Sequence, residues 1–307
     1  IQENLALGNG GGMVVANAPA TVRGCTFLDN SGVAGGAVYI GDAGAPEFES
    51  CSFTSNAAET DGGAVANVVN VQARFTGCTF LQNSAARSGG AVINSVNASS
   101  MFLGCRFVGN SAASSGGAMF NFQSSPVVVN AAFSGNSAAL GGAIGNRDGA
   151  APTLTNCSFS GNSATSGGGV YNSFESSPVV VNCILWANTE VGGQLRMQQI
   201  RTESGTPVVN FTCIQDGWDG AGGQGIVAAD PLFAAATGTD GAFGTEDDDL
   251  RLQSGSPCID AGLNDVDVDP AAEGVQSLPE TDLSGAPRIR DGKADGTAAV
   301  DLGAYES

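Results

Sequence analysis

The sequence contains no histidine among its 307 residues. Histidine is the commonest general base at neutral pH and a frequent zinc ligand, so its absence excludes histidine-activated nucleophiles and most zinc sites. Basic residues are also few, since 11 Lys and Arg stand against 30 Asp and Glu, for a formal charge of −19. Nucleic acids and anionic membranes are bound by basic surfaces, and we therefore expect neither as a partner.

Long apolar runs are missing as well. The sequence has no stretch of about 18 apolar residues, so we expect no membrane insertion by this chain. Glycine, in contrast, is abundant, with 46 residues, and 42% of all residues are hydrophobic. This composition is typical of a chain that is rich in turns and still apolar enough to fold.

One short motif recurs along residues 1–193. It reads Cys-x-Phe-x-x-Asn followed, after a variable run, by Gly-Gly, as in Cys51, Phe53, Asn56 and Gly62. The repeat length is 26 or 27 residues. Helical repeats mostly need about 33 residues or more, and the Leu-x-x-Leu-x-Leu pattern of leucine-rich repeats is absent. The period therefore predicts an all-β fold, a β-solenoid in which the strands of successive coils stack in parallel, about 4.8 Å apart.

Each repeat is predicted to contribute three short strands and a set of stacked side chains. One phenylalanine per repeat should form an aromatic column in the interior, and the Val or Phe three residues before each cysteine should form a second column. Two sets of asparagines should form hydrogen-bonded ladders at the bends, where the Gly-Gly pairs supply positive φ. The aromatic column is Phe27, Phe53, Phe80, Phe107, Phe133 and Phe159; the ladders are Asn30, Asn56, Asn83, Asn110, Asn136, Asn162 and Asn188, and Asn67, Asn94, Asn121, Asn146 and Asn172.

Seven of the eight cysteines are spaced by about one repeat and should lie in one column. Side chains that project in parallel from neighbouring strands rarely reach the torsion of about 90° that a disulfide needs, so we expect free, buried thiols. A metal–thiolate site is disfavoured because the column lies in an apolar interior and lacks Cys-x-x-Cys spacing. These cysteines are Cys25, Cys51, Cys78, Cys105, Cys157, Cys183 and Cys213.

The repeats end near Cys213, and the charge changes there. Residues 1–213 carry 11 acidic and 7 basic side chains, whereas residues 214–307 carry 19 and 4. We interpret residues 1–213 as parallel β-helix repeats and residues 214–307 as an acidic, loop-rich capping segment that closes the C-terminal end of the stack. The first coil begins in mid-repeat, and we expect its strand edges to be covered by further residues or by a partner.

Calcium is the cofactor that the acidic segment suggests. Two acidic stretches follow the repeats, a loop at residues 237–249 and an alternating Asp-Val-Asp-Val-Asp run at residues 265–269 that would place its carboxylates on one side. Hard cations take such oxygen ligands. The second stretch is not an EF-hand loop, because Pro270 stands where glycine is needed, and a solvated acidic loop without an ion remains the alternative. The candidate metal ligands are Asp240, Asp247, Asp249, Asp265, Asp267 and Asp269.

Two surface features are candidates for contacts with other molecules. The stretched repeat between Cys183 and Cys213 contains Arg196 and Arg201, which could contact a ligand or belong to an ordinary loop. An outward column is more apolar than a solvated face requires and could dock another subunit or a glycan. This docking strip is Leu28, Thr54, Leu81, Val108, Ser134, Ser160 and Trp186.

The paired Phe-x-x-Asn and Gly-Gly-Ala-[Val/Ile/Met] motifs resemble the repeats of the chlamydial polymorphic outer-membrane proteins. Those proteins are surface-exposed adhesins built as right-handed parallel β-helices. The later stretches Asp230–Phe233, Ser256–Asp260 and Asp301–Glu306 resemble the closing segment of secreted bacterial β-helix proteins of the choice-of-anchor kind. The resemblance implies a right-handed parallel β-helix, a bacterial protein located outside the cell or at its surface, and a role in adhesion or envelope architecture.

Together these observations favour a non-catalytic structural or adhesive protein. Its expected partners are copies of itself, joined end to end or laterally, other surface proteins, and envelope or extracellular glycans. The alternative is a polysaccharide lyase or glycoside hydrolase that acts in a lateral groove. A glycosidase needs two carboxylates about 5 to 9.5 Å apart, whereas the acidic residues of the repeats occupy different positions from one coil to the next.

Overall fold

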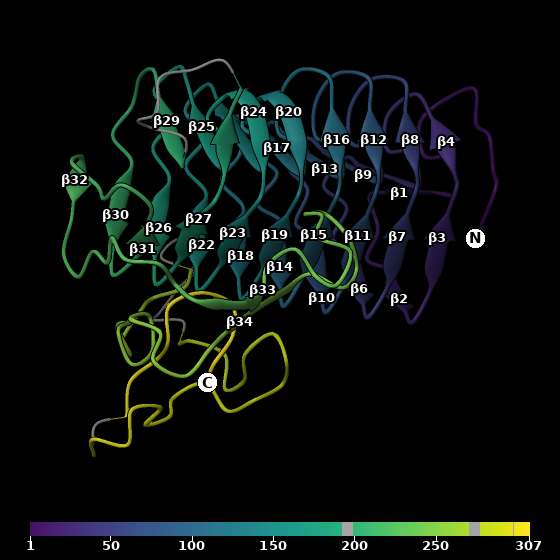
Figure 1. The fold of residues 1–307 in the computed structure, drawn as a ribbon. Coiled ribbons are helices and arrows are strands. Elements are labelled where there is room, and N and C mark those ends of the chain that lie inside the picture. The colour runs from purple at the N-terminus through teal and green to yellow at the C-terminus, as the bar shows by residue number, and fades with distance from the viewer. Residues whose placement is uncertain (192–198, 270–276, 297) are drawn as a thin grey trace.

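The computed structural model describes residues 1–191, 199–269, 277–296 and 298–307. Within these residues the secondary structure consists of strands and turns, without helices. Accordingly, the described chain offers no helix of the length and apolarity that crossing a membrane requires. Parallel strands stack coil upon coil from the N-terminus to β32, and the last residues lie against one side of the stack (Figure 1). The predicted all-β solenoid is confirmed.

The first sheet contains the strands that follow the Gly-Gly pairs. Its strands pair in parallel and in order, each with the equivalent strand of the next coil. It contains β1 (Met13–Ala16), β5 (Val38–Gly41), β9 (Val65–Val68), β13 (Val92–Ser95), β17 (Met119–Phe122), β21 (Ile144–Arg147), β25 (Val170–Asn172) and β29 (Ile200–Thr202).

The second and third sheets contain the strands before and after each cysteine. The second sheet contains β2 (Thr21–Arg23), β6 (Glu47–Glu49), β10 (Arg74–Thr76), β14 (Met101–Leu103), β18 (Val127–Val129), β22 (Thr153–Thr155), β26 (Val179–Val181), β30 (Val208–Asn210) and β32 (Ala221–Gly222). The third sheet contains β3 (Thr26–Leu28), β7 (Ser52–Thr54), β11 (Thr79–Leu81), β15 (Arg106–Val108), β19 (Ala132–Ser134), β23 (Ser158–Ser160), β27 (Ile184–Trp186) and β31 (Cys213–Ile214).

A fourth sheet of very short strands corrects the prediction of three strands per coil. Each of its strands follows an asparagine of the first ladder, and the side-chain bonds of that ladder hold the backbone in register there. It contains β4 (Ser31–Gly32), β8 (Ala57–Ala58), β12 (Ser84–Ala85), β16 (Ser111–Ala112), β20 (Ser137–Leu140), β24 (Ser163–Ser166) and β28 (Thr189–Glu190). Five of these seven strands have only two residues, too few to show an alternating pattern, so the sequence gives no periodic signal for them.

Stacked phenylalanines fill the interior, as predicted. Successive rings from Phe27 to Phe159 lie 4.6–4.8 Å apart between centroids and within 7° of parallel. This separation matches the distance between neighbouring strands, about 4.8 Å, so each coil adds one ring to the column. The second predicted column is also present: Phe48, Phe75 and Phe102 stack at 5.0 and 4.9 Å and meet the first column edge to face. All these rings are fully buried.

Both asparagine ladders are present. In the first, each side-chain amide from Asn30 to Asn162 donates to the side-chain oxygen of the next asparagine over 2.7–3.0 Å. From Asn56 onward, each side chain also donates to the backbone oxygen of a phenylalanine of the previous coil, as Asn56 does to Phe27, whereas Asn30 donates to that of Ile1. The second ladder runs from Asn67 to Asn172 over 2.8–2.9 Å. Buried amides therefore find hydrogen-bond partners coil after coil.

The Gly-Gly pairs stand where the backbone of one coil lies directly on the next. Gly62 has φ +66°, and a Cβ on Gly63 would lie 2.1 Å from the backbone oxygen of Gly90. The first glycine is thus required by its left-handed conformation and the second by the close approach of the neighbouring coil. This double requirement explains why the pair recurs.

The six repeat cysteines from Cys25 to Cys183 are free thiols, as predicted, and all except half-buried Cys25 are buried. They lie in one interior column, but Cys213 does not. Cys213 pairs with Ile184, so Thr212 takes the interior position and accepts a bond from the backbone N of Cys183 over 3.4 Å. A shift of one residue turns a strand side chain to the opposite face, and the prediction that Cys213 lies in the column is wrong for this reason.

The end of the chain follows a path that the sequence did not predict. Parallel pairing continues beyond residue 213, where β32 pairs with β30 and Val227 bridges to Cys213. Residues 230–307, here called the C-terminal segment, then run back along the side of the stack instead of closing its end (Figure 1). They include one antiparallel pair, β33 (Phe233–Ala235) with β34 (Asp249–Leu252). The C-terminal segment therefore lies beside the stack, and the expectation that it closes the end is wrong for these residues.

Candidate functional site

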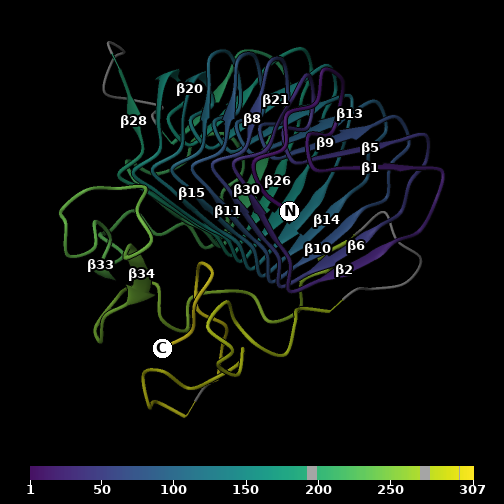
Figure 2. The same ribbon diagram turned by 90° about the vertical axis from the view of Figure 1, so that its right-hand side faces the viewer.

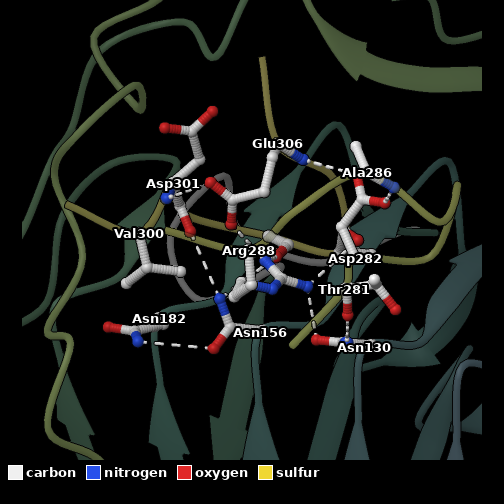
Figure 3. Close-up of polar contacts among 12 residues, drawn as sticks. Asn130, Asn156, Asn182, Thr281, Asp282, Ala286, Arg288, Val300, Asp301 and Glu306 are labelled. Atoms are coloured by element: carbon white, nitrogen blue, oxygen red, sulfur yellow. Dashed lines mark hydrogen bonds and ion pairs between the residues drawn. The ribbon is translucent and has the colours of Figure 1, made fainter. Parts of the chain in front are cut away.

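Three asparagines of the β-helix hold the C-terminal segment. Asn130 donates to the backbone oxygen of Thr281 over 2.8 Å, and Asn156 donates to that of Asp301 over 3.2 Å (Figure 3). Asn182 donates to the backbone oxygen of Leu263 and accepts from its backbone N, over 2.9 and 2.8 Å. All three have φ of 51–55°, a conformation that asparagine tolerates. In the four preceding coils the equivalent residues are Gly24, Ser50, Gly77 and Gly104.

A buried ion pair lies above these asparagines. Nη1 of Arg288 donates to Oε1 of Glu306 over 2.6 Å, and both side chains are only 1% exposed. Nη2 of Arg288 donates to the side-chain oxygen of Asn130, which ties the pair to the β-helix (Figure 3). The other oxygen of Glu306 accepts from the backbone N of Asp301 over 3.1 Å. Both members of the pair belong to the C-terminal segment, and the hydrogen bond from Arg288 to Asn130 fastens the segment to the stack.

The carboxyl groups of this interface have altered pKa values. Burial raises the pKa of Glu306 to about 8, against the lowering effect of Arg288, and the nearby charge of Asp301 adds to the rise. Burial also raises the pKa of Asp301, which accepts hydrogen bonds from Asp260 and Ser307. Both carboxyl groups are buried under the segment, and this arrangement suits a structural attachment that depends on pH.

Glycines on the surface of the β-helix allow the loop at 237–249 to pack closely against its backbone. A Cβ on Gly135 would lie 2.2 Å from Cα of Gly244, and a Cβ on Gly161 would lie 2.1 Å from the ring of Phe243. Ser134 donates to the buried carboxylate of Asp248, which also accepts from the backbone N of Gly244. The equivalents of these glycines in the first three coils are Asp29, Ser55 and Gln82. The glycines that let the C-terminal segment pack closely against the β-helix are therefore present only in the later coils.

The predicted docking strip is largely occupied by this segment. Val108, Ser134 and Ser160 are buried beneath it, whereas Leu28, Thr54 and Leu81 are half-buried. The chain covers the strip over the later coils with its own residues, and Ser134 hydrogen-bonds to Asp248 there. The prediction of an open strip for another molecule is wrong for those coils.

The carboxylates of the loop at 237–249 are engaged in local contacts. Asp247 accepts from Thr239 and Thr245, and these bonds lower its pKa. Asp249 forms an ion pair with Arg251 at 2.6 Å, which lowers the pKa of Asp249. Asp240 accepts from the backbone N of Ala242 over 2.8 Å. The three side chains serve as turn and ion-pair groups of the loop.

The alternating acidic run lies against the second sheet. Val266 and Val268 are buried against Val127 and Val129 of β18, and this leaves the aspartates at 265, 267 and 269 on the opposite side, as their spacing predicts. Asp267 accepts from the backbone N of Asp269 over 3.2 Å. Among the residues that the structure describes, three or more acidic or cysteine side chains do not gather in a metal-binding arrangement. Calcium binding stays a prediction.

The outer face of the first sheet carries aromatic side chains, of which Phe120 and Phe122 are half-buried and Tyr171 is 5% exposed. Strand register places Tyr39, Ala66, Ile93, Phe120, Gly145, Tyr171 and Arg201 in one column. These side chains point outward, because their neighbours in each strand, such as Val38 and Met119, are buried in the interior. Seen from the N-terminal end, β1, β5, β9 and β13 lie on the side away from β33, β34 and the C-terminus (Figure 2).

Aromatic rings and arginines gather at the later coils of this sheet. We call the group of Phe120, Phe122, Arg147, Tyr171, Phe174 and Arg201 the aromatic–arginine face. The guanidinium carbon of Arg147 lies 4.6 Å from the ring centroid of Phe174, which is 55% exposed and has a left-handed φ of 49°. Burial and a hydrogen bond with Glu203 raise the pKa of Tyr171 to about 12. The same left-handed φ recurs at the equivalent residues Val96, Gln123 and Asp148, so it belongs to the turn of the repeat, and Phe174 is distinguished by its exposed ring.

A cavity of about 970 Å³ lies at the end of the stack, between β29, β30 and the loop that follows β31. Its lining includes Ile200, Ile214 and Trp218. The indole of Trp218 donates to Ala221 over 2.9 Å, and a Cβ on Gly220 would lie 2.4 Å from its ring. The loop thus covers the only tryptophan of the cavity, so the cavity is a poorer candidate site than the aromatic–arginine face.

Comparison with known families agrees with this geometry. Residues 1–138 match the family model described as right handed beta helix region, and residues 156–173 match the Chlamydia polymorphic membrane protein repeat. The second match spans Phe159, Asn162 and the Gly-Gly pair at 167–168, which are the elements of the motif. The chain is a right-handed β-helix repeat protein. Its repeats are like those of the chlamydial proteins and indicate a surface-type β-helix protein. No curated protein matches the chain.

Sequence reasoning on this β-helix protein missed the aromatic–arginine face. The signal was available, because Phe120 and Tyr171 follow directly after inward-facing residues that close the Gly-Gly motif. Arg201, which the sequence offered either as a ligand contact or as part of an ordinary loop, lies in β29 next to Tyr171 in the column. Arg196 lies outside the described residues.

Proposed function

We propose that this protein is a non-catalytic, surface-displayed or secreted adhesive protein that binds extracellular or envelope glycans with the aromatic–arginine face. The observation that supports the proposal is the exposed ring of Phe174, stacked with Arg147, beside half-buried Phe120 and Arg201 on the outer face of the first sheet. The surface-type repeat family supports a location outside the cell.

The chemistry of the face suits a carbohydrate. Aromatic rings offer flat apolar surfaces to the C–H faces of sugar rings, while a few polar groups fix orientation. Arg147 and Arg201 supply donors, and Glu203 supplies acceptors for hydroxyl groups. Phe120 and Phe174 belong to coils two apart, a separation of about 10 Å along the stack at the strand spacing of a sheet, so an extended glycan can contact both.

A glycan array followed by titration calorimetry tests this proposal. The wild-type chain is expected to bind at least one glycan, and the double variant Phe120→Ala/Phe174→Ala should bind it about tenfold or more weakly, because central aromatic contacts dominate binding energy. Leu81→Ala on the opposite, third sheet is the matched control and should bind as the wild type does. Failure of the wild type to bind glycans would refute the function, and unchanged binding by the double variant would refute the site.

The same samples discriminate the enzymatic alternative. A polysaccharide lyase or glycoside hydrolase releases new chain ends, whereas an adhesive protein leaves the bound glycan intact. We expect unchanged glycan length after prolonged incubation with the wild-type protein. Shortened products that disappear with the double variant would support catalysis instead.

A further inference from the structure

The shift of one residue at β31 moves a thiol from the interior to the interface with the C-terminal segment. Cys213 pairs with Ile184, whose side chain points outward beneath Gly303 of that segment. Cys213 is nevertheless fully buried, because the segment covers it. Its cover includes the eighth cysteine, Cys258, which is also fully buried.

Cys258 is held at this position by the fold of the C-terminal segment. Its backbone N donates to the hydroxyl of Ser256 over 3.1 Å, and its backbone oxygen accepts from Leu302 over 2.9 Å. The side chains of Cys213, Cys258, Ile184 and Leu302 form one buried cluster between the last coil and the segment. The thiol of Cys213 donates to the backbone oxygen of Ala229 over 3.3 Å, and the neighbouring Cys258 together with burial raises its pKa.

We infer that Cys213 and Cys258 form a disulfide that joins the last coil to the C-terminal segment. The two side chains approach each other from opposite sides of an interface, whereas the column cysteines project in parallel from neighbouring strands. Only the opposed arrangement lets the Cβ atoms converge as a disulfide requires. The bond covalently secures the segment that covers the third sheet.

The reaction is a thiol–disulfide exchange with a small-molecule disulfide such as oxidised glutathione. The thiolate of one cysteine attacks a sulfur of the small disulfide and releases one small thiol. The thiolate of the second cysteine then attacks the mixed disulfide, forms the Cys213–Cys258 bond and releases the second small thiol. Two electrons and two protons pass to the small disulfide. Burial and the raised pKa of Cys213 make thiolate scarce in the folded chain, so exchange takes place before the segment docks.

The test uses the full chain, refolded with a mixture of reduced and oxidised glutathione. Peptide mapping by mass spectrometry without reduction is expected to show a single cross-link, between Cys213 and Cys258, and six free thiols. Cys157 and Cys183, neighbours in the interior column, are the internal control and should remain reduced. Eight free thiols under these conditions, or a cross-link between other cysteines, would overturn the inference.

Proteolysis supplies a second measurement. The cross-linked chain should lose residues 259–307 to a protease about tenfold more slowly than the same chain treated with reductant, since the bond opposes opening of the segment. Cys258→Ser should abolish this effect of reductant while Cys183→Ser leaves it in place. Equal rates with and without reductant in the wild type would also count against the bond.

Discussion

Asn188 donates a hydrogen bond from its side-chain amide to Oε1 of Gln199 over 2.6 Å. Gln199 thus takes the place that the next asparagine of the first ladder would occupy. Its own amide returns a bond to the backbone oxygen of Asn188 over 3.1 Å. The ladder therefore ends on a satisfied side chain, and every amide between Asn30 and Asn188 depends on its neighbours in two coils.

Removing one amide from the middle of this ladder should destabilise the protein. Asn110→Ala deletes the acceptor of two bonds from Asn83 and the donor to Asn136. Unsatisfied buried groups cost about 1–3 kcal/mol each, so we expect the free energy of unfolding to fall by about 3 kcal/mol. Guanidinium denaturation measures this change. Asn4→Ala at the exposed start of the same ladder is the control and should cost less than about 0.5 kcal/mol; similar losses in the two variants would contradict the role of burial.

Sequence spacing predicted the interior because the interior obeys one rule. When coils of 26 or 27 residues stack in register, residues one period apart must meet, and Phe107 and Phe133 therefore stack at 4.7 Å. The same rule located the asparagine ladders and the Gly-Gly turns. In-register stacking of the coils, together with the identity of the repeated residue, was sufficient for each of these predictions.

The rule fails where a contact joins the repeats to residues outside them. The C-terminal segment has no repeat frame, so its path could not be predicted from spacing. The residues that bind the segment are nevertheless visible in the sequence. The residue before the cysteine position is Gly104 in one coil, becomes Asn130 in the next and stays Asn in the two coils after that. Cys213 was misplaced for a related reason. The spacing of Cys213 fits a stretched coil. A shift of one residue in the strand register, however, turns its side chain from the interior to the outer face, and spacing alone does not reveal that shift.

The close packing of the C-terminal segment against Gly135 can be tested by adding one methyl group. Gly135→Ala would place a Cβ against Gly244, so we expect the loop at 237–249 to detach and its amides to exchange hydrogen at least about tenfold faster. Gly149→Ala is the matched control: it has a similar positive φ, +75°, but its Cβ would meet nothing within 4 Å. It should show only the cost of its conformation, about 1 kcal/mol. Faster exchange of the loop in both variants would mean that the close approach is unimportant.

Calcium binding by the acidic run at 265–269 is testable by titration. Titration calorimetry with CaCl₂ should detect binding to the wild-type chain, and replacing Asp265, Asp267 and Asp269 by Asn should abolish it, because amides lack the charge that holds Ca²⁺. Asp249→Asn is the control, since Asp249 is paired with Arg251, and it should bind with unchanged affinity. Absence of heat in the wild type would show that the run is a solvated acidic segment without an ion.

The attachment of the C-terminal segment should weaken as pH rises. The pKa of Glu306 is about 8 in the folded protein and about 4.5 as its ordinary value, so the folded state holds the proton more tightly. The contribution of protonated Glu306 to the free energy of unfolding is complete below about pH 4.5 and is lost as pH rises through about 8. The free energy falls by up to about 1.4 kcal/mol per pH unit in this range. The raised pKa of Asp301 acts in the same direction. Hydrogen exchange of residues 298–307 at pH 6 and pH 9, corrected for the intrinsic rate, measures the effect.

Glu306→Gln separates this titration from other effects of pH. Glutamine keeps the shape of the side chain and its acceptor for Arg288 and does not titrate. We therefore expect the variant to lose most of the difference in exchange between pH 6 and pH 9, while the coils around Asn56, distant from the segment, stay protected at both pH values. If the wild type held the segment more firmly at pH 9, the charge of Glu306 would be stabilised by Arg288 more than burial opposes it, and the pair would then act as an ordinary salt bridge.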